Sequence, residues 1–357
     1  MRFLAAVLAL HVSAALAGEV WVPLTPPEAQ AGTSVLTADP FAPETLYADA
    51  YSSNSVVKST DGGATWNAVL RYSPSELVGN IVVERSGANR VTVLTTDLLE
   101  VNVYRAADGG AVWSRYHVSL PVTGIPWDMA IDPLDSNTLY IAHAKSCYID
   151  CIAESGGISK STDGGRTWTA IVKGRFVEQI LIDPFGSGTI YAGVGFSGAT
   201  GWRRSTDGGA TWSFLPQPGT DSIFRIAFDP LLPGVLYAGT SEGNLWRSDD
   251  RGNTWHLLGK PFISPLAFPW TIAVDPTQRQ TIVVGGGSFD GASRSSDGGR
   301  TWSPLNNGLT GFAIAPSQLA YFRTVFFTTN GRLYGASNLG GALMLVESRP
   351  RRRPARH

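Results

Sequence analysis

The chain has 357 residues, of which 43% are hydrophobic, 16% are charged and 40 are glycine. This composition suits many short buried strands joined by tight turns, and it excludes an architecture of long charged helices. The formal net charge of −1 conceals an asymmetry, because residues 349–357 contain five arginines and no acid. The rest of the chain is therefore acidic, which argues against a nucleic-acid-binding face.

The first 17 residues have the pattern of a secretory signal peptide. Arg2 is followed by an apolar stretch over residues 3–10, and Ala15-Leu16-Ala17 forms a small-x-small cleavage site before Gly18. The apolar stretch is shorter than the roughly 20 residues that a membrane-spanning helix needs. We therefore expect a secreted or periplasmic protein with no transmembrane segment after cleavage, a folded domain over residues 18–348 and a disordered basic tail over 349–357.

A nine-residue unit, which we call the box, recurs along the whole chain. Its fullest copy runs from Lys160 to Trp168 with the sequence KSTDGGRTW. The intervals between the central acids run from 43 to 55 residues, a period typical of propellers and solenoids built from sheet units. The six copies have their acid and their tryptophan at Asp61 and Trp66, Asp108 and Trp113, Asp163 and Trp168, Asp207 and Trp212, Asp250 and Trp255, and Asp297 and Trp302.

A second unit precedes most boxes: an apolar strand that ends in Asp-Pro, followed by a strand similar to Leu-Tyr-Ala. Each repeat is thus predicted to form four strands, as in a propeller blade. After the sixth box, residues 312–316, 333–336 and 343–346 are predicted to form three strands of a seventh blade. Residues 20–24 resemble the strands that leave the boxes and can supply the fourth. The prediction is an all-β, seven-bladed propeller whose N-terminal strand closes the last blade and removes the exposed sheet edges.

The sequence Ser-x-Asp-Gly-Gly-x-Thr-Trp resembles the Asp-box, or bacterial neuraminidase repeat, over essentially the whole mature chain. The resemblance implies a β-propeller like those of sialidases, xyloglucanases, sortilin and the photosystem II assembly factors, and of secreted bacterial proteins with repeats of this type. Because one catalytic acid would not be present in six copies, we interpret the box acids as structural groups that accept backbone N–H bonds in their own hairpins. The motif specifies the fold more closely than the function.

Cys147 and Cys151 are the only cysteines, and in an exported protein they are expected to form a local disulfide. A loop this small gains little chain-entropy stabilisation, so the bond would shape the loop rather than hold the fold. No second pair of ligands lies at a suitable spacing, and the sequence therefore predicts neither a metal site nor a cofactor.

The order of the strands places the boxes and the Asp-Pro turns on one face, so binding residues are expected on the opposite face. Positions four residues before each Asp-Pro acid would surround the mouth of the central channel, and aromatic and acidic residues precede several of them. The ligand-binding residues predicted in this way are Asn80, Trp127, Asp128, Gln179, Arg225 and Trp270. The alternative is that these polar groups bind channel water while the aromatic rings cap the blades.

Two classes of function remain after these steps. A sialidase would need an arginine cluster with an Arg-Ile-Pro motif near the N-terminus, and the similar string Phe224-Arg225-Ile226-Ala227 lacks the proline. A xyloglucanase-like enzyme would need two opposed carboxylates, for which Asp128, Glu178 and Asp290 are the candidates. We interpret the chain instead as a monomeric binding or assembly module for a protein, peptide or glycan at the cell envelope, with a glycoside hydrolase as the alternative.

Overall fold

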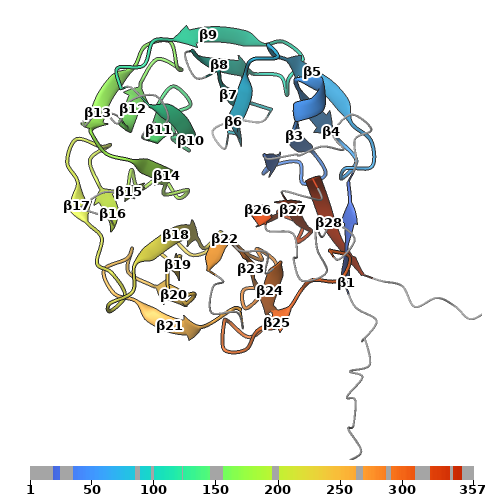
Figure 1. Cartoon of the computed structure of the whole chain (residues 1–357), viewed down its shortest axis with the longest axis vertical. Helices are drawn as coiled ribbons and strands as arrows, with labels where there is room; N and C mark the ends of the chain where they lie inside the picture. Colours follow the sequence, from blue (N-terminus) through green and yellow to red (C-terminus); the bar gives the residue numbers. More distant parts are fainter. Residues whose placement is uncertain are drawn as a thin grey trace, which may run out of the picture.

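Seven four-stranded antiparallel sheets form a closed ring in the computed structural model (Figure 1). The structure describes residues 19–24, 35–84, 89–97, 100–122, 124–144, 156–194, 201–262, 268–286, 291–309, 322–337 and 341–347. Apart from one 3-10 turn at Tyr51–Ser53, every regular element in these ranges is a strand. The predicted all-β, seven-bladed propeller is confirmed.

Blades 1 to 6 run outward from the central channel in chain order, so that the first strand is innermost and the fourth lies at the rim (Figure 1). Blades 1 to 3 consist of β2 (Leu36–Ala38), β3 (Leu46–Ala50), β4 (Ser55–Ser59) and β5 (Asn67–Arg71); β6 (Leu77–Val83), β7 (Val91–Thr96), β8 (Val101–Ala106) and β9 (Ser114–Val118); and β10 (Ile125–Ile131), β11 (Leu139–Ala144), β12 (Gly157–Ser161) and β13 (Thr169–Lys173). Blades 4 to 6 consist of β14 (Val177–Ile182), β15 (Ile190–Val194), β16 (Gly201–Ser205) and β17 (Ser213–Phe214); β18 (Ile223–Phe228), β19 (Leu236–Thr240), β20 (Leu245–Ser248) and β21 (His256–Gly259); and β22 (Pro269–Val274), β23 (Ile282–Gly286), β24 (Ala292–Ser295) and β25 (Ser303–Pro304).

Blade 7 is completed by the N-terminal strand, as predicted. Its strands are β26 (Phe322–Phe327), β27 (Leu333–Ser337), β28 (Gly341–Glu347) and, outermost, β1 (Glu19–Pro23), with Trp21 opposite Leu345. The innermost strand is not the predicted segment 312–316, which lies outside the described residues. A Thr328-Thr329-Asn330-Gly331 turn stands where the other blades have Asp-Pro, and for this reason the Asp-Pro signal did not reveal β26.

The hydrophobic core lies between neighbouring blades. The second strand of every blade is buried along its whole length, because both of its faces are covered by adjacent sheets. Between blades 2 and 3, for example, Leu94 and Val103 pack with Ile141 and the box residue Trp168. The box tryptophan therefore joins its own blade to the preceding one.

Each box closes a hairpin between the third and fourth strands with side-chain hydrogen bonds. At Asp207, one carboxylate oxygen accepts the Thr211 backbone N–H at 2.9 Å and the Ser205 hydroxyl at 2.7 Å, while the other accepts the Thr211 hydroxyl at 2.6 Å. The Gly208 and Gly209 φ angles of +69° and +91° lie in the left-handed region that favours glycine.

The box of one blade is also bound by the blade before it. The Lys160 ammonium donates to the Gly208 carbonyl oxygen at 2.9 Å, and the Tyr140 hydroxyl donates to the same oxygen at 3.2 Å. Lys58 and Tyr47 bind the Gly109 carbonyl in the same way. The repeated basic residue and the repeated tyrosine therefore tie neighbouring blades together at the face that bears the boxes, which we call the box face.

The box predicts how stability depends on pH. Hydrogen bonds from Thr211 and Ser205 lower the pKa of Asp207 from 3.8 to about 2. Because the folded-state pKa lies below the unfolded value, this stabilisation is present above about pH 4 and is lost as the pH falls towards 2. We expect Asp207→Asn to lower the free energy of unfolding at pH 6, and the gap from wild type to close by pH 2 in urea denaturation curves. A gap that stays constant over this range would contradict the assignment.

Candidate functional site

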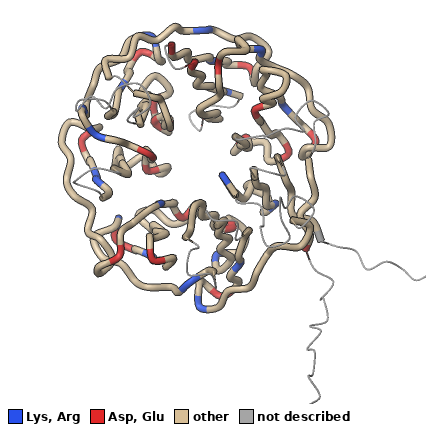
Figure 2. The backbone as a smooth tube through the Cα atoms, viewed as in Figure 1, with Lys and Arg blue, Asp and Glu red and all other residues tan. Residues whose placement is uncertain are grey.

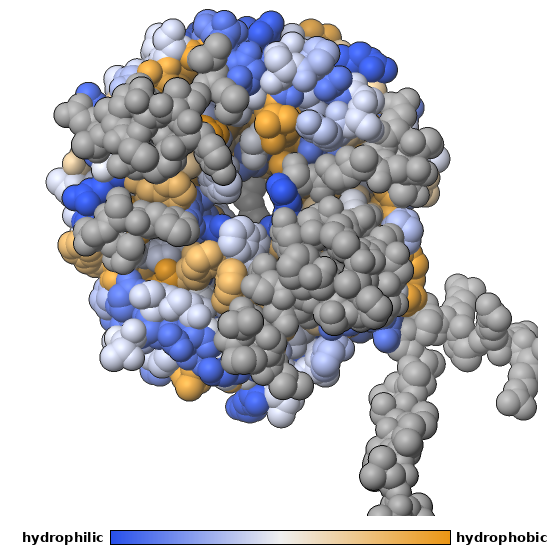
Figure 3. Space-filling model, in the orientation of Figure 1, coloured by the Kyte–Doolittle hydropathy of each residue, from blue (hydrophilic) through white to orange (hydrophobic). Residues whose placement is uncertain are grey.

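The opposite end of the channel, which we call the mouth, opens into a cavity of about 1130 Å³ lined by the innermost strands. The space-filling view shows an opening at the centre of the ring, with hydrophilic and hydrophobic residues at its edge (Figure 3). Lys, Arg, Asp and Glu are distributed around the ring rather than gathered in one sector (Figure 2). What distinguishes the mouth is therefore the particular set of side chains that reach it.

A β-bulge recurs at the same place in six innermost strands. The register to the second strand skips one residue in each case, so the skipped side chain is re-aimed relative to the regular pleat. The skipped residues are Gly79, Trp127, Glu178, Phe224, Trp270 and Arg323. Five of them line the cavity, and Phe224 packs behind it against Trp270, with ring centroids 5.3 Å apart.

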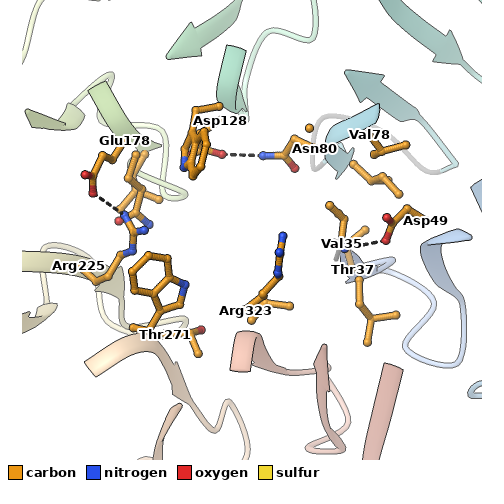
Figure 4. A pocket seen from close by; sticks show the side chains of 18 of the residues that line it. Val35, Thr37, Asp49, Val78, Asn80, Asp128, Glu178, Arg225, Thr271 and Arg323 are labelled. Atoms are coloured by element: carbon orange, nitrogen blue, oxygen red, sulfur yellow. Dashed lines mark hydrogen bonds and ion pairs between the residues drawn. The ribbon is translucent and has the colours of Figure 1, made fainter. Parts of the chain in front are cut away.

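In five of these strands, the residue after the bulge connects its blade to a neighbour. The Asn80 amide donates to Asp128 at 2.6 Å, and Asp128 in turn accepts the Ile180 backbone N–H at 3.0 Å (Figure 4). Further round the ring, the Val325 backbone N–H donates to the Thr271 hydroxyl at 3.1 Å. These polar residues therefore hold the innermost strands in place around the mouth.

Arg225 joins three blades at one edge of the cavity. Its guanidinium lies 3.6 Å from the Glu178 carboxylate on one side and 4.4 Å from the centre of the Trp270 ring on the other (Figure 4). Burial lowers the pKa of Arg225, while Glu178 and Asp128 oppose that change. The ion pair and the stacked ring together fix both Trp270 and Glu178.

The Asp128 carboxylate is fully engaged by donors. It accepts bonds from Asn80, from the Ile180 N–H and, at 2.9 Å, from its neighbour's N–H at Met129. Burial nevertheless raises its pKa from 3.8 to about 6, against the opposing effects of those donors and of Arg225. Burial also raises the pKa of Glu178.

These properties predict a second pH effect, opposite in sign to that of the box. Because the folded-state pKa of Asp128 exceeds the unfolded value, ionisation costs stability as the pH rises from about 4 through 6. Relative to Asp128→Asn, the wild-type protein should lose free energy of unfolding over this interval in urea titrations. If the wild-type protein instead becomes more stable than Asp128→Asn as the pH rises, the hydrogen-bond donors lower the pKa of Asp128 more than burial raises it.

The comparisons with known proteins agree with this architecture. Residues 202–347 match the family model described as "Sortilin-Vps10: Sortilin, neurotensin receptor 3". The GH74 enzyme of Niastella koreensis superposes with a TM-score of 0.67 at 18% identity, over 90% of this chain and 53% of that one. The structure of YCF48 bound to D1 peptide superposes with a TM-score of 0.66 at 17% identity, over 92% and 96% of the two chains. The chain therefore has the seven-bladed propeller fold of these solved structures.

Among curated proteins, a xyloglucanase from Paenibacillus sp is 28% identical over 292 residues. The alignment covers 67% of this propeller but only 28% of that enzyme. The chain therefore spans less than a third of the relative's length, and the enzyme's activity does not transfer with the fold.

The structure brings the six predicted binding residues to one cavity. Asn80, Trp127, Asp128, Gln179, Arg225 and Trp270 all line the mouth, together with the candidate acid Glu178. Trp127 is the most open of the aromatic residues among them, with 49% of its surface exposed. The other candidate acid, Asp290, and the cysteines at 147 and 151 lie outside the described residues.

Arg323 is a mouth residue that the sequence analysis missed. It occupies the bulge of β26, is exposed, and its side chain extends toward the centre of the cavity (Figure 4). The run Phe322-Arg323-Thr324-Val325 is rich in aromatic and β-branched residues and is followed by Asn-Gly and Leu-Tyr, which is a strand-and-turn signal. It was missed because the innermost strands were located by their Asp-Pro turns.

Within the described part of the chain, no group of three or more His, Cys, Asp or Glu residues is arranged to bind a metal ion. No helix in the same ranges is long and apolar enough to cross a membrane. The described residues of the mouth thus offer aromatic surfaces, two arginines and three carboxylates, each of which has a partner within the propeller.

Proposed function

We propose that this propeller is a binding module that holds a peptide segment of a partner protein in the channel mouth. The main support is that the mouth residues form two groups: some bond to neighbouring blades, and others are exposed to solvent in the cavity. Asp128 is occupied by bonds between blades, whereas Trp127 and Arg323 line the cavity and are exposed. Exposed tryptophan and arginine side chains are the groups that contribute most to peptide and protein recognition.

A peptide suits the shape and chemistry of this cavity. Its volume of about 1130 Å³ accommodates several residues, and its walls combine the Trp127 and Trp270 rings with backbone-rich strand ends. The exposed arginine of the mouth, Arg323, favours a ligand with at least one carboxylate. The similar fold of YCF48 in complex with D1 peptide supports this proposal by analogy.

Selection from a random peptide display library on the immobilised propeller tests the proposal. We expect selected peptides to share aromatic and acidic positions, and to bind Arg323→Ser at least about 10-fold more weakly than wild type. Arg279→Ser, an exposed arginine outside the mouth lining, serves as the matched control. Peptides that bind both variants as well as wild type would place recognition elsewhere.

A glycoside hydrolase is the second candidate, favoured by the similarity to a xyloglucanase and by the raised pKa of Asp128. A protonated carboxyl near pH 6 has the property of a general acid. Against this role, both carboxylate oxygens of Asp128 accept hydrogen bonds from backbone N–H groups of the propeller. We expect no release of reducing sugar from xyloglucan or of sialic acid from sialosides. Activity that disappears in Asp128→Asn would establish the enzyme instead.

We also propose that the partner is met outside the cytoplasm, at the cell envelope. The support is the signal-like pattern of residues 1–17. Mass spectrometry of the protein recovered from an envelope fraction should show a mature chain beginning at Gly18. Recovery of a chain that retains residues 1–17 in the cytoplasmic fraction would refute it.

A further inference from the structure

A second cavity lies between blades 3 and 4, away from the channel mouth. It has a volume of about 190 Å³, and its lining combines apolar side chains with three cations. Lys173 ends β13, Arg175 lies in the connection from β13 to β14, and Arg203 lies on β16. Basic residues mark both the β13 to β14 connection and β16 at the left of the charge view (Figure 2).

Arg203 is the unusual member of this group. It is partly buried, and its guanidinium lies 3.9 Å from the centre of the Phe214 ring. The same strand position holds Val57 in blade 1 and Ser159 in blade 3, both buried, so the blade architecture does not require a cation there. The arginine is therefore a local feature of this cavity.

No carboxylate among the described residues balances the three cations. The cavity lining contains no Asp or Glu, and none of the ion pairs found between described residues involves Lys173, Arg175 or Arg203. Burial lowers the pKa of Arg203, and the neighbouring Arg175 lowers it further. A partly buried cation that faces another cation destabilises the fold unless an anion joins them.

We propose that the cavity between blades 3 and 4 binds an anionic group, either a carboxylate or a phosphate or sulfate oxyanion. Arg203, which packs against the Phe214 ring, presents its guanidinium as a fork for two oxygens. Arg175 and Lys173 close the opening as exposed point charges. A volume of about 190 Å³ admits a single such group with its bound water, so the site recognises the charged end of a ligand.

Inorganic phosphate and glutarate are the two probes, with sodium chloride at matched ionic strength as the reference. We expect a saturable rise of about 2 °C or more in the melting temperature with at least one probe, and one bound ion per chain by equilibrium dialysis. A response to phosphate alone identifies an oxyanion, and a response to glutarate alone identifies a carboxylate. Equal responses to both probes and to chloride would overturn the proposal.

Arg203→Met separates binding from folding, because methionine keeps the apolar contact with Phe214 without the charge. Without added anion the variant should melt at the wild-type temperature or above it, since the repulsion from Arg175 is gone, and it should show no response to either probe. Arg175→Gln, at an exposed position, should also lose most of the response. Arg300→Met, an exposed arginine of the sixth box, should keep it. An unaltered response in both Arg203→Met and Arg175→Gln would refute the site, whatever the mouth binds.

Discussion

Trp21→Ala is expected to lower the free energy of unfolding by about 3 to 5 kcal/mol, the range found for removing large buried aromatic side chains. Trp21 is 2% exposed, packs against Phe322 with ring centroids 4.8 Å apart, and donates its indole N–H to the Leu305 carbonyl oxygen at 2.7 Å. A single side chain of β1 thus contacts both blade 7 and blade 6. Urea denaturation followed by tryptophan fluorescence and circular dichroism measures the loss.

Removal of residues 20–24 should have a larger effect, because it exposes β28 as an open sheet edge and leaves the ring unclosed. We expect the cooperative transition to be lost or strongly broadened. The bond from the Trp21 backbone N–H to the Asn307 carbonyl would be lost with these residues, and Glu19 would lose the strand that holds it beside Arg294. A deletion variant that melts like the wild type would show that the ring is stable without its closing strand.

Trp127→Ala should weaken ligand binding while it leaves the stability of the fold nearly unchanged. Half of this side chain is exposed at the mouth, so its removal is expected to change the free energy of unfolding by only about 0.5 kcal/mol. The same change should weaken a mouth-binding peptide by about 30-fold or more, equivalent to about 2 kcal/mol, because aromatic anchors dominate such interfaces. Isothermal titration calorimetry with a selected peptide measures the affinity.

The two tryptophans control for each other. Trp21→Ala should reduce stability while the molecules that remain folded keep the wild-type affinity, and Trp127→Ala should reduce affinity while stability is kept. Both properties falling together in Trp127→Ala would indicate that the residue supports the fold. Unchanged affinity in a stable Trp127→Ala protein would count against peptide binding at the mouth.

The mouth residues show which features of the site local sequence patterns can predict and which they cannot. Counting back from the Asp-Pro turns predicted that Asn80, Asp128 and Arg225 share one opening, because the blades repeat the same strand geometry. The bulges at the preceding residues were not predictable from the sequence, since a bulge depends on the pairing of two strands rather than on one residue type. These bulges direct Trp127 and Arg323 into the cavity.

The seventh blade illustrates the limit of a signal based on one turn motif. Its Thr-Thr-Asn-Gly turn makes the same connection as Asp-Pro but does not resemble it, so β26 and Arg323 were not found. The closing strand was found, because the apolar and tryptophan pattern of residues 20–24 resembles that of the strands that follow the boxes.

By itself the sequence determined the repeat, the number of blades and the closure of the ring, because each box and turn is a local device whose hydrogen bonds lie within a few residues of one another. Only the tertiary structure decided what the mouth residues do. Asp128 meets Asn80 from blade 2 and Ile180 from blade 4, and Arg225 meets Glu178 and Trp270 from the blades on either side. These contacts join residues 45 to 52 positions apart. They depend on how the blades are placed around the ring, and no local pattern in the sequence specifies which of these side chains meet.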